Sequence, residues 1–100
     1  MSASVDFERV NRAALAVLPA LLARWLPDGR RMAGEWVARN PRRADRSPGS
    51  FKISLRSGRW ADFATGDRSG DVVSLAAYLA GMGQADAARE LARALGIEPR

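Results

Sequence analysis

The segment 51–64 constrains the fold most, because its pattern fits a β-hairpin. Phe51, Ile53 and Leu55 alternate with polar residues, which is the period of a half-buried strand. A turn at Ser57-Gly58 separates this strand from a return strand that is again rich in apolar residues. An antiparallel hairpin is therefore the centre of the expected fold.

A tight two-residue turn would pair Arg56 with Arg59 and Ile53 with Asp62. Like charges placed directly opposite cost some stability, so such a pair suits anion binding, although long side chains can also splay into water. One face of the hairpin would carry Phe51, Ile53, Leu55, Trp60 and Asp62, and the other Lys52, Ser54, Arg56, Arg59, Ala61 and Phe63. A register shifted by one residue would instead expose Asp62.

Helical periodicity precedes the hairpin. A first helix is expected from a cap at Ser4 or Asp6 to about Leu26, kinked or split at Pro19, which has no N–H to donate. Residues 31–39 fit one strand with a bulge or close backbone approach at Gly34. Residues 40–49 have no apolar periodicity and predict an exposed basic loop.

Two helices are expected after the hairpin. Asp71 is placed to cap a helix that begins at Val72 and ends near Gly81. A last helix is expected over 84–95, before Gly96. The predicted fold class is α+β, with a small antiparallel sheet of three or four strands, an N-terminal helix and two C-terminal helices.

Length and composition predict a single domain over residues 1–100. Its parts are an N-terminal helix in 1–28, a basic sheet in 29–66 and a helical tail in 67–100. The chain has no Cys and no His, so it has no disulfide and none of the thiolate or imidazole ligands of structural zinc. No segment is long and apolar enough to suggest a membrane anchor or signal peptide, so a cytoplasmic protein without a membrane partner is expected.

The positive charge is concentrated in the predicted sheet. Residues 30–59 contain nine Arg and Lys residues and two acidic residues, which gives this segment a net charge of +7 in a chain of net charge +5. Such a concentration is typical of proteins that bind phosphate. An Arg-rich composition spread over a solvated surface is the alternative explanation.

The segment 40–71 resembles the zinc ribbon of bacterial and phage DNA primases with its metal ligands replaced. That family has a Cys-Pro-x-His step, a Pro-Ser-Phe strand, an aromatic strand that ends in Cys-x-x-Cys-Gly, and a Gly-Asp that opens a helix. The corresponding pieces here are Asn40-Pro41-Arg42-Arg43, Pro48-Gly49-Ser50-Phe51, Trp60-Ala61-Asp62-Phe63-Ala64-Thr65-Gly66 and Gly70-Asp71.

The resemblance places Asn40, Arg43, Asp62 and Thr65 at the family's four ligand positions, and it implies a ribbon-like fold without metal or other cofactor. All four side chains can form hydrogen bonds. We expect Arg43 and Asp62 to form a bidentate ion pair that takes over the role of the metal, because a carboxylate on the apolar face needs a partner.

An enzyme is not expected, because the sequence offers no His, Cys or paired carboxylates, and the catalytic toprim domain of the primase family is absent. The resemblance implies a module that binds single-stranded template DNA, or RNA, in phage or plasmid-like replication, with a replication protein as a further candidate partner. Cations interleaved with an aromatic ring suit such a ligand, because bases stack on the ring while the cations contact phosphates. Phe63 is the candidate for stacking, Trp25 and Trp60 are expected in the core, and Trp36 is left unassigned. The candidate nucleic-acid-binding residues are Arg42, Arg43, Arg46, Lys52, Arg56, Arg59 and Phe63.

Two other functions remain open. A small regulator from a phage or mobile element would dock the same basic face on an acidic protein. A structural spacer within a larger primase-helicase is the third possibility. Salt dependence and competition between single-stranded DNA and candidate proteins distinguish these functions.

Overall fold

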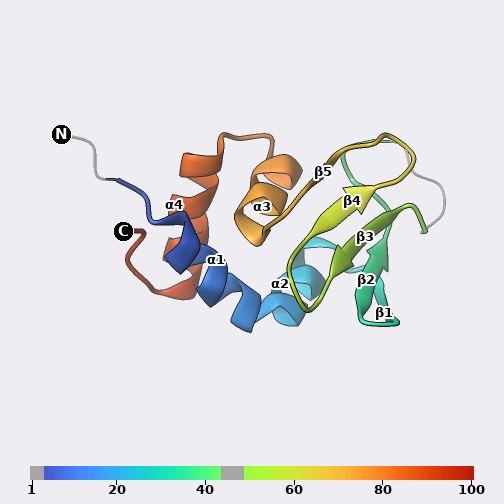
Figure 1. Ribbon diagram of the computed structural model, residues 1–100, viewed down its shortest axis with the longest axis horizontal. Coiled ribbons are helices and arrows are strands. Elements are labelled where there is room, and N and C mark those ends of the chain that lie inside the picture. The colour runs from blue at the N-terminus through green and yellow to red at the C-terminus, as the bar shows by residue number, and fades with distance from the viewer. Residues whose placement is uncertain (1–3, 44–48) are drawn as a thin grey trace.

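The computed structural model describes residues 4–43 and 49–100 of the chain. Four helices lie at one end of its long axis and the sheet at the other (Figure 1), within overall dimensions of 44 × 22 × 19 Å. In chain order the elements are α1 (Phe7–Ala16), α2 (Leu18–Trp25), β1 (Arg30–Met32), β2 (Glu35–Ala38), β3 (Phe51–Ser54), β4 (Trp60–Asp62), β5 (Arg68–Ser69), α3 (Val72–Ala80) and α4 (Gln84–Leu95). The fold is α+β, as the sequence predicts.

The sheet is antiparallel and has the strand order β1-β2-β3-β4-β5. The prediction of one strand over 31–39 is wrong, because β1 and β2 form a hairpin in which Met32 pairs with Glu35. Ala33 and Gly34, the two residues of the turn, have φ of 51° and 80°. Positive φ at both turn residues matches the twist of a tight hairpin. With the short β5, this hairpin raises the strand count to five.

The β3–β4 hairpin differs from its predicted register by two residues. Ile53 pairs with Trp60, and Phe51, not Ile53, pairs with Asp62. The connection is longer than a two-residue turn, since the Ser54 N–H donates to the Arg59 carbonyl at 2.7 Å and the Gly58 N–H donates to the Ser54 carbonyl at 2.9 Å. The predicted pairing of Arg56 with Arg59 across a tight tip is therefore wrong. The two predicted faces persist, because a shift of two residues leaves each side chain on its side of the strand.

The helix boundaries follow local signals. The Asp6 carboxylate accepts a hydrogen bond from the Arg9 N–H and caps α1, while Pro19 lies in the first turn of α2, so the predicted helix is split in two. Asp71 caps α3 in the same way, through the Ser74 N–H. Helices α3 and α4 end at glycines in the left-handed conformation.

The core lies between the helices and one side of the sheet, which we call the inner face. The inner face contributes Trp36, Ala38, Phe51, Ile53 and Trp60, and the helices contribute Val10, Ala14, Leu18, Leu22, Val72, Val73, Leu75, Ala88, Leu91 and Ala92. Trp25, a predicted core residue, is only partly buried against this cluster. The buried indole N–H of Trp36 donates to the Leu26 carbonyl at 3.2 Å. Gly29 packs against the same indole, where an added Cβ would lie 2.1 Å from Nε1.

Candidate functional site

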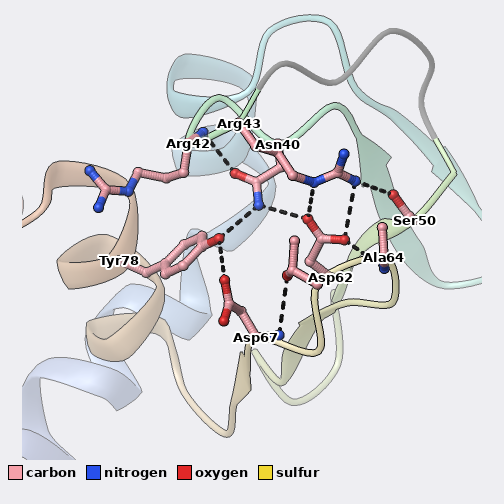
Figure 2. A network of polar contacts seen from close by, with 9 residues as sticks. Asn40, Arg42, Arg43, Ser50, Asp62, Ala64, Asp67 and Tyr78 are labelled. Carbon is pink, nitrogen blue, oxygen red and sulfur yellow. Dashed lines mark hydrogen bonds and ion pairs between the residues drawn. The ribbon is translucent and has the colours of Figure 1, made fainter.

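A buried polar cluster, which we call the Asp62 network, lies where the loop after β2 meets the end of β4 (Figure 2). Asp62 has no exposed surface. Its Oδ2 accepts hydrogen bonds from Arg43 Nε at 2.7 Å and Asn40 Nδ2 at 2.8 Å. Its Oδ1 accepts from the Ala64 N–H at 2.9 Å and Arg43 Nη2 at 3.2 Å. Four donors thus surround the carboxylate, and the expected bidentate pair with Arg43 is confirmed.

The network continues in two directions from Asp62. Arg43 Nη2 also donates to Ser50 Oγ at 2.7 Å, which ties the start of the basic loop to the residue before β3. On the other side, Asn40 Nδ2 donates to the Tyr78 hydroxyl at 2.8 Å, and that hydroxyl donates to Asp67 Oδ2 at 2.9 Å. The network therefore joins the loop after β2, the end of β4, the loop before β5 and α3.

The network also sets the ionisation of its members. The hydrogen bond from the Arg43 guanidinium holds the pKa of the Asp62 carboxyl well below its usual range, although burial opposes this shift. The hydrogen bonds from Asn40 and the Ala64 N–H act in the same direction as Arg43. Burial raises the pKa of the Tyr78 hydroxyl, and the Asp67 carboxylate raises it further. Asp62 is therefore a stable anion and Tyr78 a neutral donor at neutral pH.

The four positions that the sequence matches to the zinc ligands do not form one shell. Asn40, Arg43 and Asp62 contact one another, whereas Thr65 Oγ1 accepts a hydrogen bond from the Asp67 N–H at 3.2 Å within its own turn. A guanidinium occupies the centre of the cluster and the carboxylate oxygens already accept four hydrogen bonds, so these side chains do not fit a zinc ion. Within residues 4–43 and 49–100, no three Cys, His, Asp or Glu side chains gather where they could hold a metal.

None of the described helices lies over the other side of the sheet, which we call the outer face (Figure 1). One row of paired residues crosses all five strands there, from Arg30 through Val37, Lys52 and Ala61 to Arg68. Three cations thus alternate with two small apolar side chains. At about 4.8 Å per strand, the row is roughly 19 Å long.

Two neighbouring depressions lie along this row. One has a volume of about 730 Å³ and includes Lys52, Arg59, Phe63 and Arg68 in its lining. The other has a volume of about 430 Å³ and includes Arg30 and Lys52. Glu35 lines both and is their one acidic residue in the described part of the chain. The outer face is therefore a shallow, mainly basic channel.

Phe63 is the most exposed large apolar side chain among those described, with 71 % of its surface accessible. The Lys52 ammonium lies 5.8 Å from the centre of its ring. Such a contact keeps an aromatic face and a cation together at the surface. Phe63 is thus placed for stacking, whereas Trp36 and Trp60 are buried in the core.

Three of the remaining predicted site residues, Arg42, Arg43 and Arg56, are not among the residues that line this channel. Arg43 is bonded to Asp62, and Arg42 lies over the Tyr78 ring with its guanidinium carbon 5.9 Å from the ring centre. Arg56 lies in the β3–β4 connection. Arg46 is outside the described residues.

Sequence reasoning missed three residues that matter in this geometry. Arg30 and Arg68 join the basic row through the β1–β2 and β4–β5 pairs, which were not predicted. Tyr78 was missed because it lies 38 residues from its partner Asn40. Its hydroxyl, a polar group within a mainly apolar helix, was the available signal.

The fold resembles a known structure. The chain matches a crystal structure of the Aquifex aeolicus primase, which contains its zinc-binding and RNA polymerase domains, with a TM-score of 0.71 and 21 % sequence identity. The match covers 96 % of this chain and 23 % of the primase chain, so the chain spans about a quarter of that polypeptide. No protein-family model and no curated protein matches the sequence. Across the described residues, every helix is too short or too polar to cross a membrane.

Proposed function

We propose that this chain is a non-catalytic nucleic-acid-binding module that contacts single-stranded template DNA during replication. The transverse row of Arg30, Lys52 and Arg68 is the observation that carries the proposal. Cations spaced across an open sheet follow a phosphate backbone, and an exposed ring among them supplies a stacking surface for bases. The fold shared with a primase fragment supports a role in replication.

The geometry favours a single strand over a duplex. Phe63 stands 71 % exposed beside Lys52, and a base stacks on such a ring only when it is not paired within a helix. The row is roughly 19 Å long, which suits a site of about four nucleotides. Backbone contacts and stacking carry little sequence information, so we expect weak sequence preference.

The lack of catalysis follows from the side chains available. The chain has no His and no Cys, and the buried Asp62 carboxylate is enclosed by its hydrogen-bond donors. Glu35 is the one carboxylate that lines the outer face among the described residues, so this face has no pair of carboxylates for acid-base catalysis.

A phage or mobile-element origin is consistent with the resemblance to primases and forms part of the same proposal.

Titration of a fluorescent 12-nucleotide single strand, followed by anisotropy over a range of salt concentrations, tests the proposal. We expect the slope of log affinity against log salt to be about −0.7 per phosphate contact. Changing Arg30, Lys52 and Arg68 together to Gln should weaken binding strongly and flatten this slope. Changing Arg89 and Arg93 of α4 to Gln removes two positive charges elsewhere, compared with three from the outer face, and should have little effect.

Phe63→Ala tests stacking separately from charge. Loss of one stacked base costs about 1 to 3 kcal/mol, and the salt slope should stay unchanged because no cation is removed. An RNA strand in the same titration compares the two nucleic acids. If neither DNA nor RNA binds at low salt while an acidic protein competes for the basic channel, the module is a protein-interaction domain.

A further inference from the structure

Two adjacent arginines point in opposite directions (Figure 2). Arg43 reaches Asp62, whereas Arg42 extends away from the Asp62 network toward α3. The Arg42 backbone N–H donates to Asn40 Oδ1 at 2.8 Å, so the network fixes the point from which this side chain departs. The Arg42 side chain is therefore held in place without being part of the ion pair.

Arg42 lines a cavity of about 530 Å³ between β5 and the turn from α3 to α4. We call this cavity the Arg42 notch. Its lining includes Arg42, Arg68, Trp60, Tyr78, Gly81 and Gln84. The notch is a shallow depression that is largely open to solvent.

The end of α3 leaves room for the Arg42 guanidinium. Gly81 has a φ of +68°, and a Cβ added there would lie 3.0 Å from Arg42 Nη1. A side chain at this position would therefore press against the guanidinium. Gly81, which ends α3, therefore lines the Arg42 notch without a side chain that would crowd the Arg42 guanidinium.

No described side chain neutralises the charge of the notch. The side chains of Arg42 and Arg68 form no ion pair or hydrogen bond with the other described residues, and no Asp or Glu is among the described lining residues. The nearby Asp67 carboxylate is occupied by the Tyr78 hydroxyl. Guanidinium groups bind phosphate oxygens in pairs of parallel hydrogen bonds. We propose that the Arg42 notch binds a phosphate group.

Two sources of phosphate fit this site. Arg68, Ser69 and Trp60 line both the Arg42 notch and the larger depression of the outer face, so the terminal phosphate of a bound strand can reach the notch around β5. The triphosphate of a free nucleotide is the other source. Arg68 belongs to both sites, whereas Arg42 lines the notch alone and Lys52 the outer face alone, so variants of Arg42 and Lys52 distinguish a failure of this proposal from a failure of the proposed function.

Calorimetric titration of the full chain with pyrophosphate, and then with a nucleoside triphosphate, tests the notch directly. Arg42→Gln should lower the affinity about tenfold, because a charged hydrogen-bonded contact is lost. Arg68→Gln is a second variant with the same expectation. Arg24→Gln removes an exposed arginine of α2 that has no ion pair among the described residues, and Lys52→Gln removes a cation of the outer face alone; neither should change the affinity.

Matched oligonucleotides with a 5′-phosphate or a 5′-hydroxyl distinguish the two sources. A gain in affinity from the 5′-phosphate that Arg42→Gln abolishes assigns the notch to a strand end. An effect of Arg42→Gln on the nucleotide, with no effect of the 5′-phosphate, assigns it to a free nucleotide. Equal affinity of wild type and both notch variants for pyrophosphate, no binding at millimolar concentration, or an equal loss in Arg24→Gln would overturn the proposal.

Discussion

On the inner side of the sheet, the Arg43 guanidinium is bonded to a carboxylate that has no exposed surface. On the outer face, Arg30, Lys52 and Arg68 form no ion pair with the described residues. A buried carboxylate needs a partner, because an uncompensated charge out of water is costly, whereas a solvated cation needs none. We therefore expect changes in the Asp62 network to alter stability and changes in the outer face to alter binding.

The largest effect should come from Asp62→Ala. It leaves Arg43 and Asn40 without their shared acceptor, and breaking a buried pair costs about 3 to 5 kcal/mol of the free energy of unfolding. Urea unfolding followed by tryptophan fluorescence measures this loss.

Asp86→Ala is the matched control, because its partner Arg89 and its own carboxylate are exposed, and it should cost less than about 1 kcal/mol. A double-mutant cycle on Arg43→Ala and Asp62→Ala should show coupling above that of a surface pair. An absence of coupling would mean that Arg43 does not stabilise the inner cluster.

The pH dependence of stability should be the next largest effect. The pKa of Asp62 is lowered in the folded chain, so the unfolded chain takes up a proton first as the pH falls. The stabilisation is complete above the ordinary aspartate pKa of about 4 and is lost as the pH falls toward the folded value. The free-energy difference between wild type and Asp62→Asn should therefore shrink as the pH falls from about 5 to about 2. Urea midpoints over this range measure it, and a constant difference would contradict the assigned ionisation.

Substitutions on the outer face should change stability much less. Phe63→Ala removes a ring that lies largely in solvent, and Lys52→Gln keeps most of a half-buried side chain, so each should alter the free energy of unfolding by less than about 0.5 kcal/mol. The same urea experiment measures this. A loss as large as that of Asp62→Ala would mean that the outer face is part of the folding core and would remove the contrast between the two sides.

A chelator should have the smallest effect. The chain has no thiolate or imidazole, and the carboxylate of the Asp62 network is bonded to a guanidinium. We expect the same melting temperature with and without EDTA. Stoichiometric zinc in elemental analysis of the purified protein would show that the network does not replace the metal.

Much of the local structure could be predicted because its causes are close in sequence. Asp6 and Asp71 are capping residues directly before apolar helical patterns. Proline is tolerated in the first turn of a helix but not in its interior, so Pro19 marks the start of α2. The side chains of the β3–β4 hairpin were assigned to the correct faces for the same reason, because successive residues of a strand point to opposite sides of the sheet. The register was not predicted, because the hydrophobic pattern of the strands is equally compatible with a four-residue connection between Ser54 and Arg59.

The pair Arg43 and Asp62 was also within reach of the sequence, because a carboxylate on an apolar face requires a cation or several donors. The sequence alone determined the α+β class, the buried face of the β3–β4 hairpin and the need for a partner at Asp62. Only the tertiary structure decided that Tyr78 completes the network, that Arg30, Lys52 and Arg68 fall in one row, and that Arg42 turns away from Arg43. These features depend on strand pairing and helix docking between residues far apart in the chain, which local patterns do not encode.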